Sequence, residues 1–364
     1  MKYKKKNFKF RCPLSRRDFI KTSALSAAAL SINPKSIFAD EPKLTQVSKS
    51  IVSVSENLKA ITDDYKIDAK RVREMIDEGL KAITDTKTAK EGWLKIFPNL
   101  KEKEVIGLKV NTVNKMIPAH PEIAFAVADS LADTGVNKNK ILIFDNLDIL
   151  LTNAGYTLNT GDKGYKCYGT YHDKSIWLDP EAKVYLKSVD LERTYSRILS
   201  QHIDYLINIP VLKSADTAGV TLSLKNMYGV ISILDQATLR NGIPNSDEIT
   251  VAMKMHDHNC NPQIAEINSG EHLMKKTKLV ILDALMGIYD GSAHIAPQGT
   301  NHKIVISRDR VATDVTGFDI INARRKEKEM AEITKEKAGH IWSAEKMGIG
   351  NADPAKIELR KLSL

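Results

Sequence analysis

The fold is decided by a short apolar run, Val105-Ile106-Gly107-Leu108-Lys109-Val110, which ends in Asn111. Such a run is typical of a β-strand inside a parallel sheet that is covered on both faces. A helix is predicted close behind it, because Pro121 after His120 suits a first helical turn and Gly135 suits a helix end. A strand followed closely by a helix is the repeating unit of an α/β protein.

The same alternation continues outward from this run. Further strands are predicted from short apolar runs at residues 141–144, 184–186, 205–209, 279–282, 304–306 and near 356. Helices are predicted from apolar periodicity and breakers at residues 67–84, 121–132, 149–154, 262–275 and 311–326. Residues 156–180 and 235–262 are polar and predict loops. We therefore expect an α/β fold with a parallel or mixed β-sheet covered by helices on both faces.

The first 39 residues differ in composition from the rest. Ten Lys or Arg residues stand against one acid, which accounts for the whole formal charge of +9. The segment Ser15-Arg16-Arg17-Asp18-Phe19-Ile20-Lys21 closely matches the twin-arginine export consensus, and Ile37-Phe38-Ala39 suits a cleavage site. We expect export of the folded chain to the periplasm by the twin-arginine (Tat) translocase. The alternative is an amphipathic N-terminus with a chance arginine pair.

Three segments are expected: a signal peptide over residues 1–39, a polar tether over 40–65, and a single α/β domain over 66–364. Residues 40–364 are neutral by formal charge, which argues against binding to nucleic acid. No later run of about 18 apolar residues occurs, so we expect no transmembrane helix in the exported chain.

Motifs of the common enzyme classes are missing from the chain. It has no dinucleotide fingerprint, P-loop, nucleophile elbow, zincin motif or Cys-x-x-Cys. Once Cys12 leaves with the leader, Cys167 and Cys260 remain, too few for an iron–sulfur cluster but enough for one disulfide. The sequence leaves open whether the two pair.

Polar side chains follow the ends of several predicted strands. Ligands of open parallel sheets bind outside the carboxyl ends of the strands, so we expect the site at this edge. Lysine and amide side chains there suit a carboxylate or phosphate, although each lysine alone could equally be a solvated surface residue. The residues assigned to substrate binding are Lys109, Asn111, Lys213, Ser214, Lys225 and Asn226.

Two further side chains at this edge are assigned to proton transfer. Asp283 follows the predicted strand over 279–282, and His120 immediately precedes a predicted helix. Histidine titrates near neutral pH and can act as a general base. The alternative for His120 is a capping side chain at the helix N-terminus.

One dense cluster of metal-type ligands occurs, His256-Asp257-His258-Asn259-Cys260. In extended backbone, His256, His258 and Cys260 would lie on one side and could hold a transition metal, the one cofactor this pattern suggests. No standard zinc spacing is matched, and an ordinary polar loop is the alternative.

Several of these segments resemble domain-of-unknown-function family 362 (DUF362). The resemblance is carried by residues 106–111, 119–122, 208–214, 219–229, 259–268 and 282–284, and it spans about residues 65–360. It departs at Ala215, where the family usually has His or Lys, and at Arg310, where it usually has Pro. Ala215 raises the question of a lost activity. Some relatives carry an appended iron–sulfur domain, which implies redox chemistry, but this chain lacks the cysteines for one.

These observations support two hypotheses of function. The first is a periplasmic redox or metal-dependent enzyme that acts on a small anionic molecule. The second is a non-catalytic periplasmic binding protein for a metal, a small ligand or a redox partner.

Overall fold

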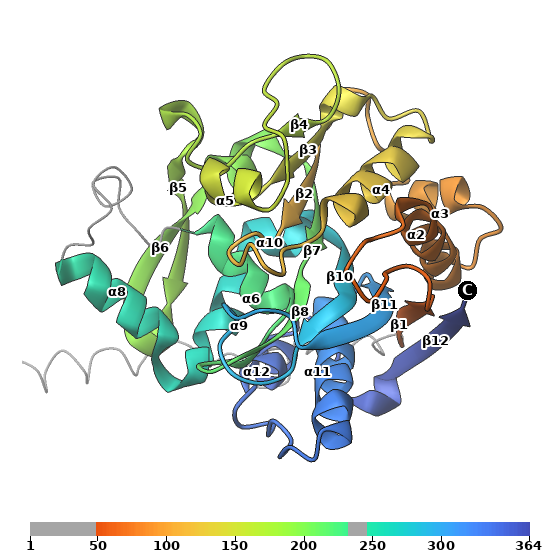
Figure 1. The fold of residues 1–364 in the computed structure, drawn as a ribbon. Helices are drawn as coiled ribbons and strands as arrows, with labels where there is room; N and C mark the ends of the chain where they lie inside the picture. The colour runs from red at the N-terminus through yellow and green to blue at the C-terminus, as the bar shows by residue number, and fades with distance from the viewer. Residues whose placement is uncertain (1–48, 232–245) are drawn as a thin grey trace, which may run out of the picture. The chain divides into compact units, whose positions relative to one another are not determined.

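The computed structural model describes residues 49–231 and 246–364. Their centre is one mixed sheet (Figure 1). Across it run β12 (Ile357–Ser363), β1 (Ser50–Glu56), β11 (Gly299–Ser307), β10 (Thr277–Ile288), β7 (Tyr205–Ile209), β2 (Ile106–Val110), β3 (Ile141–Phe144) and β4 (Lys166–Cys167). The strands from β10 to β4 are parallel to one another, and β11 is antiparallel to both β10 and β1. The predicted α/β class is confirmed.

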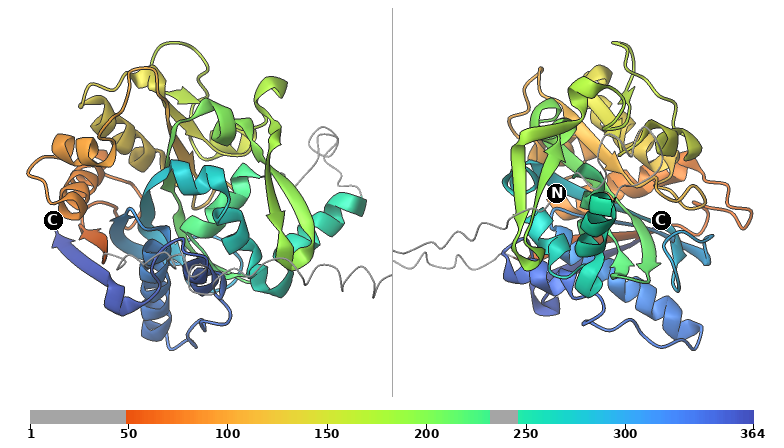
Figure 2. Two further views of the ribbon diagram at one scale, coloured as in Figure 1. Left: turned by 180° about the vertical axis from the view of Figure 1, so that it is seen from behind. Right: turned by 90° about the vertical axis from the view of Figure 1, so that its left-hand side faces the viewer.

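Helices cover both faces of the sheet (Figure 2). One face packs against α2 (Ala69–Thr84), α3 (Ala89–Ile96) and α4 (Pro121–Ala132). The other packs against α6 (Ser223–Asn226), α9 (Gln263–Asn268), α11 (Arg310–Glu327) and α12 (His340–Lys346). Neighbouring strand residues enter opposite cores: Ile306 contributes to the first and Val305 to the second. This two-sided burial explains why the strands read as continuous apolar runs.

Residues at the N-termini of the predicted long helices determine where these helices begin. The side chain of Asp68 accepts hydrogen bonds from the backbone N–H groups at the start of α2, and Asp309 does the same for α11. Such caps satisfy donors that have no partner inside the helix. Pro121 occupies the first turn of α4, although the side chain of His120 makes no capping hydrogen bond.

The extended path of β7 continues beyond the predicted strand over 205–209. Pro210 interrupts the ladder, after which β8 (Val211–Ala215) resumes pairing along the far half of β10. The backbone oxygen of Pro210 accepts from the N–H of Asp283 at 2.9 Å. Proline lacks an N–H, so it splits one long strand into two without ending the extended path. The short strand β9 (Gly219–Thr221) then pairs with β8 and leads into α6.

The predicted polar tether over residues 40–65 is wrong for its central part, which forms β1. β1 buries Val52 and Val54 in the core on one face of the sheet. Ser53 and Ser55, which alternate with them, are buried as well, because they donate to the backbone oxygens of Ile306 and Met75. Gly79 of α2 lets the helix approach, since a Cβ there would lie 3.0 Å from the Ser53 Oγ. The predicted signal peptide lies outside the described residues.

Other predicted boundaries also change. Residues 232–245, which include the start of the loop predicted over 235–262, lie outside the described residues. In the described part of that segment, α8 (Ser246–His256) replaces the expected loop. The predicted helix over 262–275 is broken at Ser269-Gly270 into α9 and α10 (Glu271–Lys276). The short helix predicted over 149–154 is α5 (Asp148–Asn153). A hairpin, β5 (Leu178–Leu186) and β6 (Leu191–Ser196), forms a separate two-stranded sheet.

Cys167 and Cys260 are both free and buried. Cys167 lies in the core beneath α4, whereas Cys260 lies in the core on the opposite face of the sheet. The disulfide that the sequence left open is therefore not formed.

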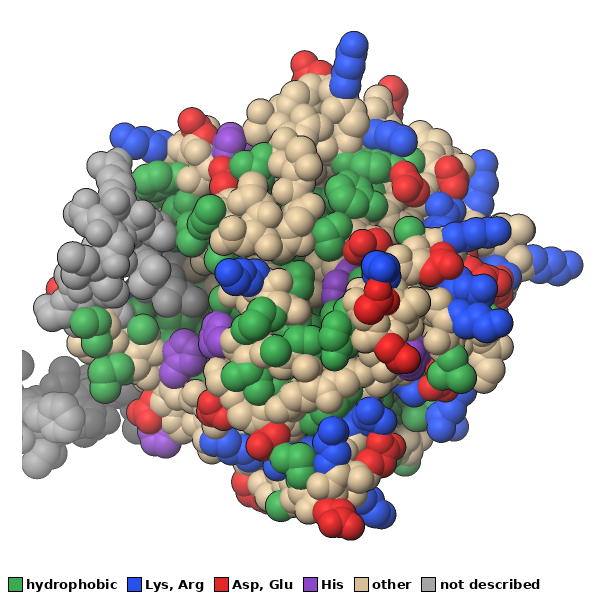
Figure 3. Space-filling model, viewed as in Figure 1, with side chains coloured by type: hydrophobic (Ala, Val, Ile, Leu, Met, Phe, Trp, Pro, Cys, Tyr) green, Lys and Arg blue, Asp and Glu red, His purple; other side chains and the backbone are tan. Residues whose placement is uncertain are grey.

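Surface charges are mixed on the face seen in Figure 3, where basic and acidic side chains are interspersed. None of the helices in the described part of the chain is long and apolar enough to cross a membrane.

Candidate functional site

A cavity of about 240 Å³ lies at the carboxyl ends of β2 and β3, beside β8 and α6. This is the edge at which the sequence predicts a site. Its polar lining is Lys109, Asn111, Asp145, Asn146, Lys213, Thr221, Lys225, Asn226, Tyr228, His256 and His294. Val113, Leu150 and Ala293 add an apolar part. A small concave site with a few convergent polar groups is the usual form of a ligand pocket.

Lys109 and Asp145 join two strand ends at the bottom of the cavity. The Nζ of Lys109 lies 2.7 Å from the Asp145 Oδ1 and donates to the backbone oxygen of Val110 at 2.7 Å. The other carboxylate oxygen accepts from the N–H and hydroxyl of Thr112 at 2.7 and 2.6 Å. A Cβ on Gly229 would lie 2.8 Å from the Lys109 Nζ, so glycine makes room for this pair.

A row of amides connects the lysines. The Asn226 Oδ1 accepts from the Asn111 Nδ2 at 3.0 Å and from the Lys109 Nζ at 3.3 Å. Its Nδ2 donates to the Asn208 Oδ1 at 2.7 Å. Because each amide both donates and accepts here, the orientation of Asn226 is set by the network. The amide oxygen of Asn111 is thereby left to face Lys213.

Lys213 is fully buried, and its Nζ donates to the Asn111 Oδ1 at 2.7 Å. No carboxylate in the described part of the chain lies at ion-pair distance from it. Burial lowers its pKa to about 7, which Asp145 and Asp283 partly counteract and which Lys109 and Lys225 reinforce. An ammonium in a low-dielectric site without a counterion loses its proton readily. Lys213 can therefore exchange a proton near neutral pH.

Lys225 differs from the other two lysines. Within residues 49–231 and 246–364 its ammonium has neither a hydrogen-bond nor an ion-pair partner, although it lines the cavity. Burial lowers its pKa as well. An unpaired, partly desolvated cation in a cavity is the arrangement expected of a group that awaits an anion.

His120 and Asp283 form a close pair, but they do not line this cavity. The His120 Nδ1 donates to the Asp283 Oδ2 at 2.6 Å, and the backbone N–H of His120 donates to the same oxygen at 3.0 Å. Burial lowers the pKa of His120, but the charge of Asp283 outweighs it, so the net shift is upward. Both groups lie within electrostatic range of Lys213.

Ser214 is separated from the other predicted binding residues. It lines a different polar depression with Asp290 and Lys337, and its hydroxyl donates to the backbone oxygen of Gly291 at 3.3 Å. Successive side chains of a strand point to opposite sides, so Lys213 and Ser214 in β8 cannot share one cavity. The structure thus brings together Lys109, Asn111, Lys213, Lys225 and Asn226.

The predicted metal cluster does not have the extended backbone it requires. His256 ends α8, and the next turn contains His258, Asn259 and Cys260 with φ between 48° and 59°. His258 is exposed, whereas Cys260 is buried in the core, because the turn sends the side chains in different directions. In the described ranges, no three His, Cys, Asp or Glu side chains are placed to hold a metal ion.

Several cavity residues were not among the predicted site residues. Asp145 directly follows the predicted strand over 141–144, so its position was a usable signal. Tyr228 and His294 come from the turn after α6 and the loop after β10, whereas His256, predicted as a metal ligand, reaches the cavity from the end of α8. No local pattern indicates that these segments meet.

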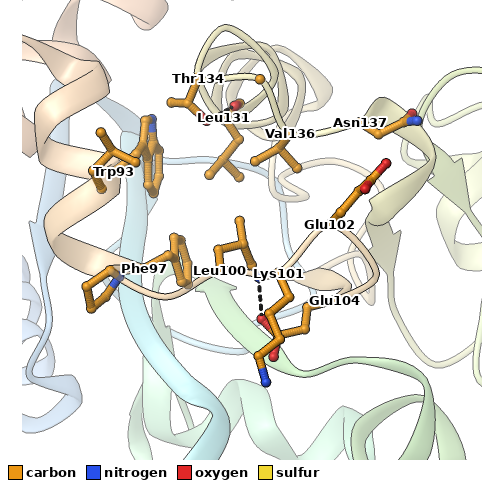
Figure 4. A pocket seen from close by; sticks show the side chains of 13 residues that line it. Trp93, Phe97, Leu100, Lys101, Glu102, Glu104, Leu131, Thr134, Val136 and Asn137 are labelled. Atoms are coloured by element: carbon orange, nitrogen blue, oxygen red, sulfur yellow. Dashed lines mark hydrogen bonds between the residues drawn. The ribbon is translucent and has the colours of Figure 1, made fainter.

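A second cavity, of about 450 Å³, lies near the opposite end of β2. Figure 4 shows Trp93, Phe97 and Leu100 facing Leu131 and Val136 across it. The Trp93 and Phe97 rings stack at 6.1 Å. Its walls combine these apolar side chains with charged ones, Lys101, Glu102 and Glu104, and it lies away from the carboxyl ends of the strands.

The fold and the lysine-rich cavity define an α/β protein with a cationic pocket at the carboxyl edge of a mixed sheet. The chain belongs to the DUF362 family, a domain of unknown function, whose sequence profile matches residues 106–319. A crystal structure of a Thermotoga maritima protein resembles it with a TM-score of 0.41 and 12% identity. That alignment covers 71% of this chain and 59% of the other. A search of curated proteins found no match.

Proposed function

We propose that the protein binds a small organic anion, with a single carboxylate or phosphate group, in the cavity beside α6. One observation carries this proposal: three lysines line the cavity, and Asp145 is the one carboxylate in the described lining. Asp145 is already paired with Lys109. The ammonium of Lys225 and the titrating amine of Lys213 therefore face the cavity without a counterion.

The size and lining support a small ligand. A cavity of about 240 Å³ suits a small molecule, and its polar side offers amide and ammonium donors in fixed positions. Charge-assisted hydrogen bonds from such donors are stronger than neutral ones and select for an anion. Val113 and Leu150 would contact an apolar part of the molecule.

This charge pattern favours an anionic ligand over a metal ion. Lysine ammonium groups repel a cation and cannot coordinate one while protonated. Both the enzyme hypothesis and the binding-protein hypothesis include a small ligand, and the lining of the cavity supports an anionic one.

Calorimetric titration tests the proposal directly. Lactate and inorganic phosphate are titrated into the full chain to distinguish a carboxylate site from a phosphate site. Lys225→Met should lower the affinity for the bound anion about tenfold to a hundredfold, because a hydrogen bond to a charged group contributes about 1.5–3 kcal/mol. The matched control is Lys328→Met, at an exposed position after α11. Equal affinities in all three proteins would refute the assignment.

We also propose that the chain is exported through the Tat pathway and acts in the periplasm. The support is the order of basic segment, arginine pair, mild apolar stretch and cleavage-type residues. Replacing Arg16 and Arg17 together by lysine should keep the protein in the cytoplasm on fractionation. Continued appearance of the double variant in the periplasm would contradict this route.

A further inference from the structure

We propose that Lys225 is a nucleophile whose Nζ condenses with the carbonyl group of a small oxo-carboxylate, while Lys213 holds the carboxylate and His256 accepts the proton that the amine releases. This inference rests on the proposed function, because it adds a carbonyl group to the small anion bound there.

The three cavity lysines have three different environments. Lys109 is neutralised by Asp145, and Lys213 donates to the amide of Asn111. Lys225 has no such partner among the described residues and is the least buried of the three. Its free Nζ is therefore the amine that an incoming molecule would meet first.

The surroundings of Lys225 favour the neutral amine. Burial lowers the pKa of Lys225, and the nearby Cys260 counteracts part of this shift. Lys225 and Lys213 lie within electrostatic range of each other, because the charge of Lys225 also lowers the pKa of Lys213. Desolvation and a neighbouring cation are the two ways in which proteins activate a lysine for attack on a carbonyl. Lys213 is less suited to attack, since its side chain is fully buried and its Nζ already donates to the Asn111 Oδ1. Its other N–H donors remain for the carboxylate of a ligand in the cavity that it lines.

His256 is held as a proton acceptor on the same cavity wall. Its Nδ1 lies 2.8 Å from the backbone oxygen of Ala252, which can only accept, so Nδ1 carries the hydrogen and Nε2 keeps its lone pair. Burial lowers the pKa of His256, as does the charge of Lys225. The ring also packs edge-on against Tyr228 at 5.5 Å.

Tyr228 is itself fixed, because its hydroxyl donates to the backbone oxygen of Met255 at 2.7 Å. The acceptor nitrogen of His256 is thus positioned without help from a ligand. The residue predicted as a metal ligand becomes a positioned base.

The chemistry balances without an oxidant or reductant. The nitrogen lone pair forms a bond to the carbonyl carbon, and the C=O π electrons move to oxygen, which takes a proton from solvent. His256 accepts a proton from the attacking nitrogen and returns it when the hydroxyl group leaves as water. The product is a protonated imine between Lys225 and the former oxo-carboxylate. Its positive nitrogen draws electrons from the bonds next to the former carbonyl carbon, so the reactions it assists are proton removal or carbon–carbon cleavage there.

Reductive trapping tests this proposal. The full chain is incubated with pyruvate and sodium borohydride, digested, and mapped by mass spectrometry. We expect one reduced adduct, on Lys225. Lys225→Arg should give none while keeping the positive charge, and Lys328→Arg should react like the unchanged protein. Adducts confined to other lysines would overturn the assignment.

A second measurement separates the nucleophile proposal from the proposed anion site on which it rests. Lactate has the carboxylate of pyruvate but no carbonyl, so it should bind by calorimetry and compete with trapping. Binding of both acids without any adduct overturns the nucleophile and leaves the anion site standing. If neither acid binds and no adduct forms, both the nucleophile and the anion site are overturned.

His256 is tested through the rate of trapping. His256→Phe keeps an aromatic ring beside Tyr228 but has no acceptor nitrogen. The trapping rate at Lys225 should fall about tenfold or more, as for loss of a general base, and lactate affinity should be unchanged. An unchanged rate would remove His256 from the mechanism.

Discussion

The Nζ of Lys109 lies 2.7 Å from the Oδ1 of Asp145, and this pair joins the ends of β2 and β3 beneath the cavity. Both side chains are almost entirely buried. The pair therefore supports the site in two ways: it fixes the two strand ends, and it occupies Asp145, the one carboxylate in the described lining of the cavity.

Removing one member of this pair should destabilise the fold. Lys109→Met leaves the Asp145 carboxylate buried without its counterion, which costs about 3–5 kcal/mol. Asp145→Asn should have a comparable cost. Chemical denaturation of the two single variants and the double variant measures the coupling. If the two losses simply add, the pair does not act as a unit.

The pH dependence of stability should reveal Lys213. Its pKa is about 7 in the folded protein, below the ordinary lysine value, so the unfolded chain binds more protons above pH 7. Stability should then rise with pH between about 7 and 10, by up to about 1.4 kcal/mol per pH unit from this group. Urea denaturation of the unchanged protein and Lys213→Met across this range isolates the effect. Parallel pH curves for the two proteins would contradict it.

The stability that His120 contributes should change with pH in the opposite direction, falling as the pH rises. Its pKa is raised in the folded state by Asp283, once the lowering by burial is overcome. A raised pKa stabilises the protein below the ordinary histidine value, and this stabilisation is lost as the pH rises through the folded-state pKa. His120→Gln should therefore destabilise the protein more at pH 5.5 than at pH 8.5, as measured by denaturation. A larger loss at pH 8.5 would show that the pair is not charged.

Gly229 should be needed for the cavity. A Cβ there would lie 2.8 Å from the Lys109 Nζ, so Gly229→Ala must displace the lysine from Asp145. We expect a loss of about 1–3 kcal/mol from overpacking and a loss of lactate affinity. Gly161→Ala is the matched control, because its Cβ would meet its nearest neighbour at 3.4 Å, and it should leave both properties unchanged. Equal behaviour of the two variants would refute this account.

Short-range patterns were enough for much of the fold. The run at 106–110, Pro121 and the cap at Asp309 give their signals within a few residues, so β2, α4 and α11 were predictable. β1 was missed because serines alternate with its buried Val52 and Val54, so the run looks polar in sequence, whereas Ser53 and Ser55 are buried by donating to distant backbone oxygens. α8 was missed inside a polar segment.

The site was predictable in part for the same reason. Lys109 and Asn111 stand at a strand end, and the rule that ligands meet the carboxyl edge of parallel strands applies to them directly. The metal cluster was wrong because its premise was an extended backbone, whereas a helix end and a left-handed turn separate His256 from Cys260. No local pattern distinguishes these conformations in a polar stretch.

The amino-acid order thus settled the element types and the edge where polar groups collect, because apolar period, proline and capping residues act over one or two turns. Long-range packing settled which of those groups share a cavity. Lys109 meets Asp145 through the pairing of β2 with β3, and His256 reaches the cavity because α8 returns to pack on Tyr228. Such contacts join residues far apart in the chain. The tertiary structure must therefore form before burial and neighbouring charges can shift the pKa values of these side chains.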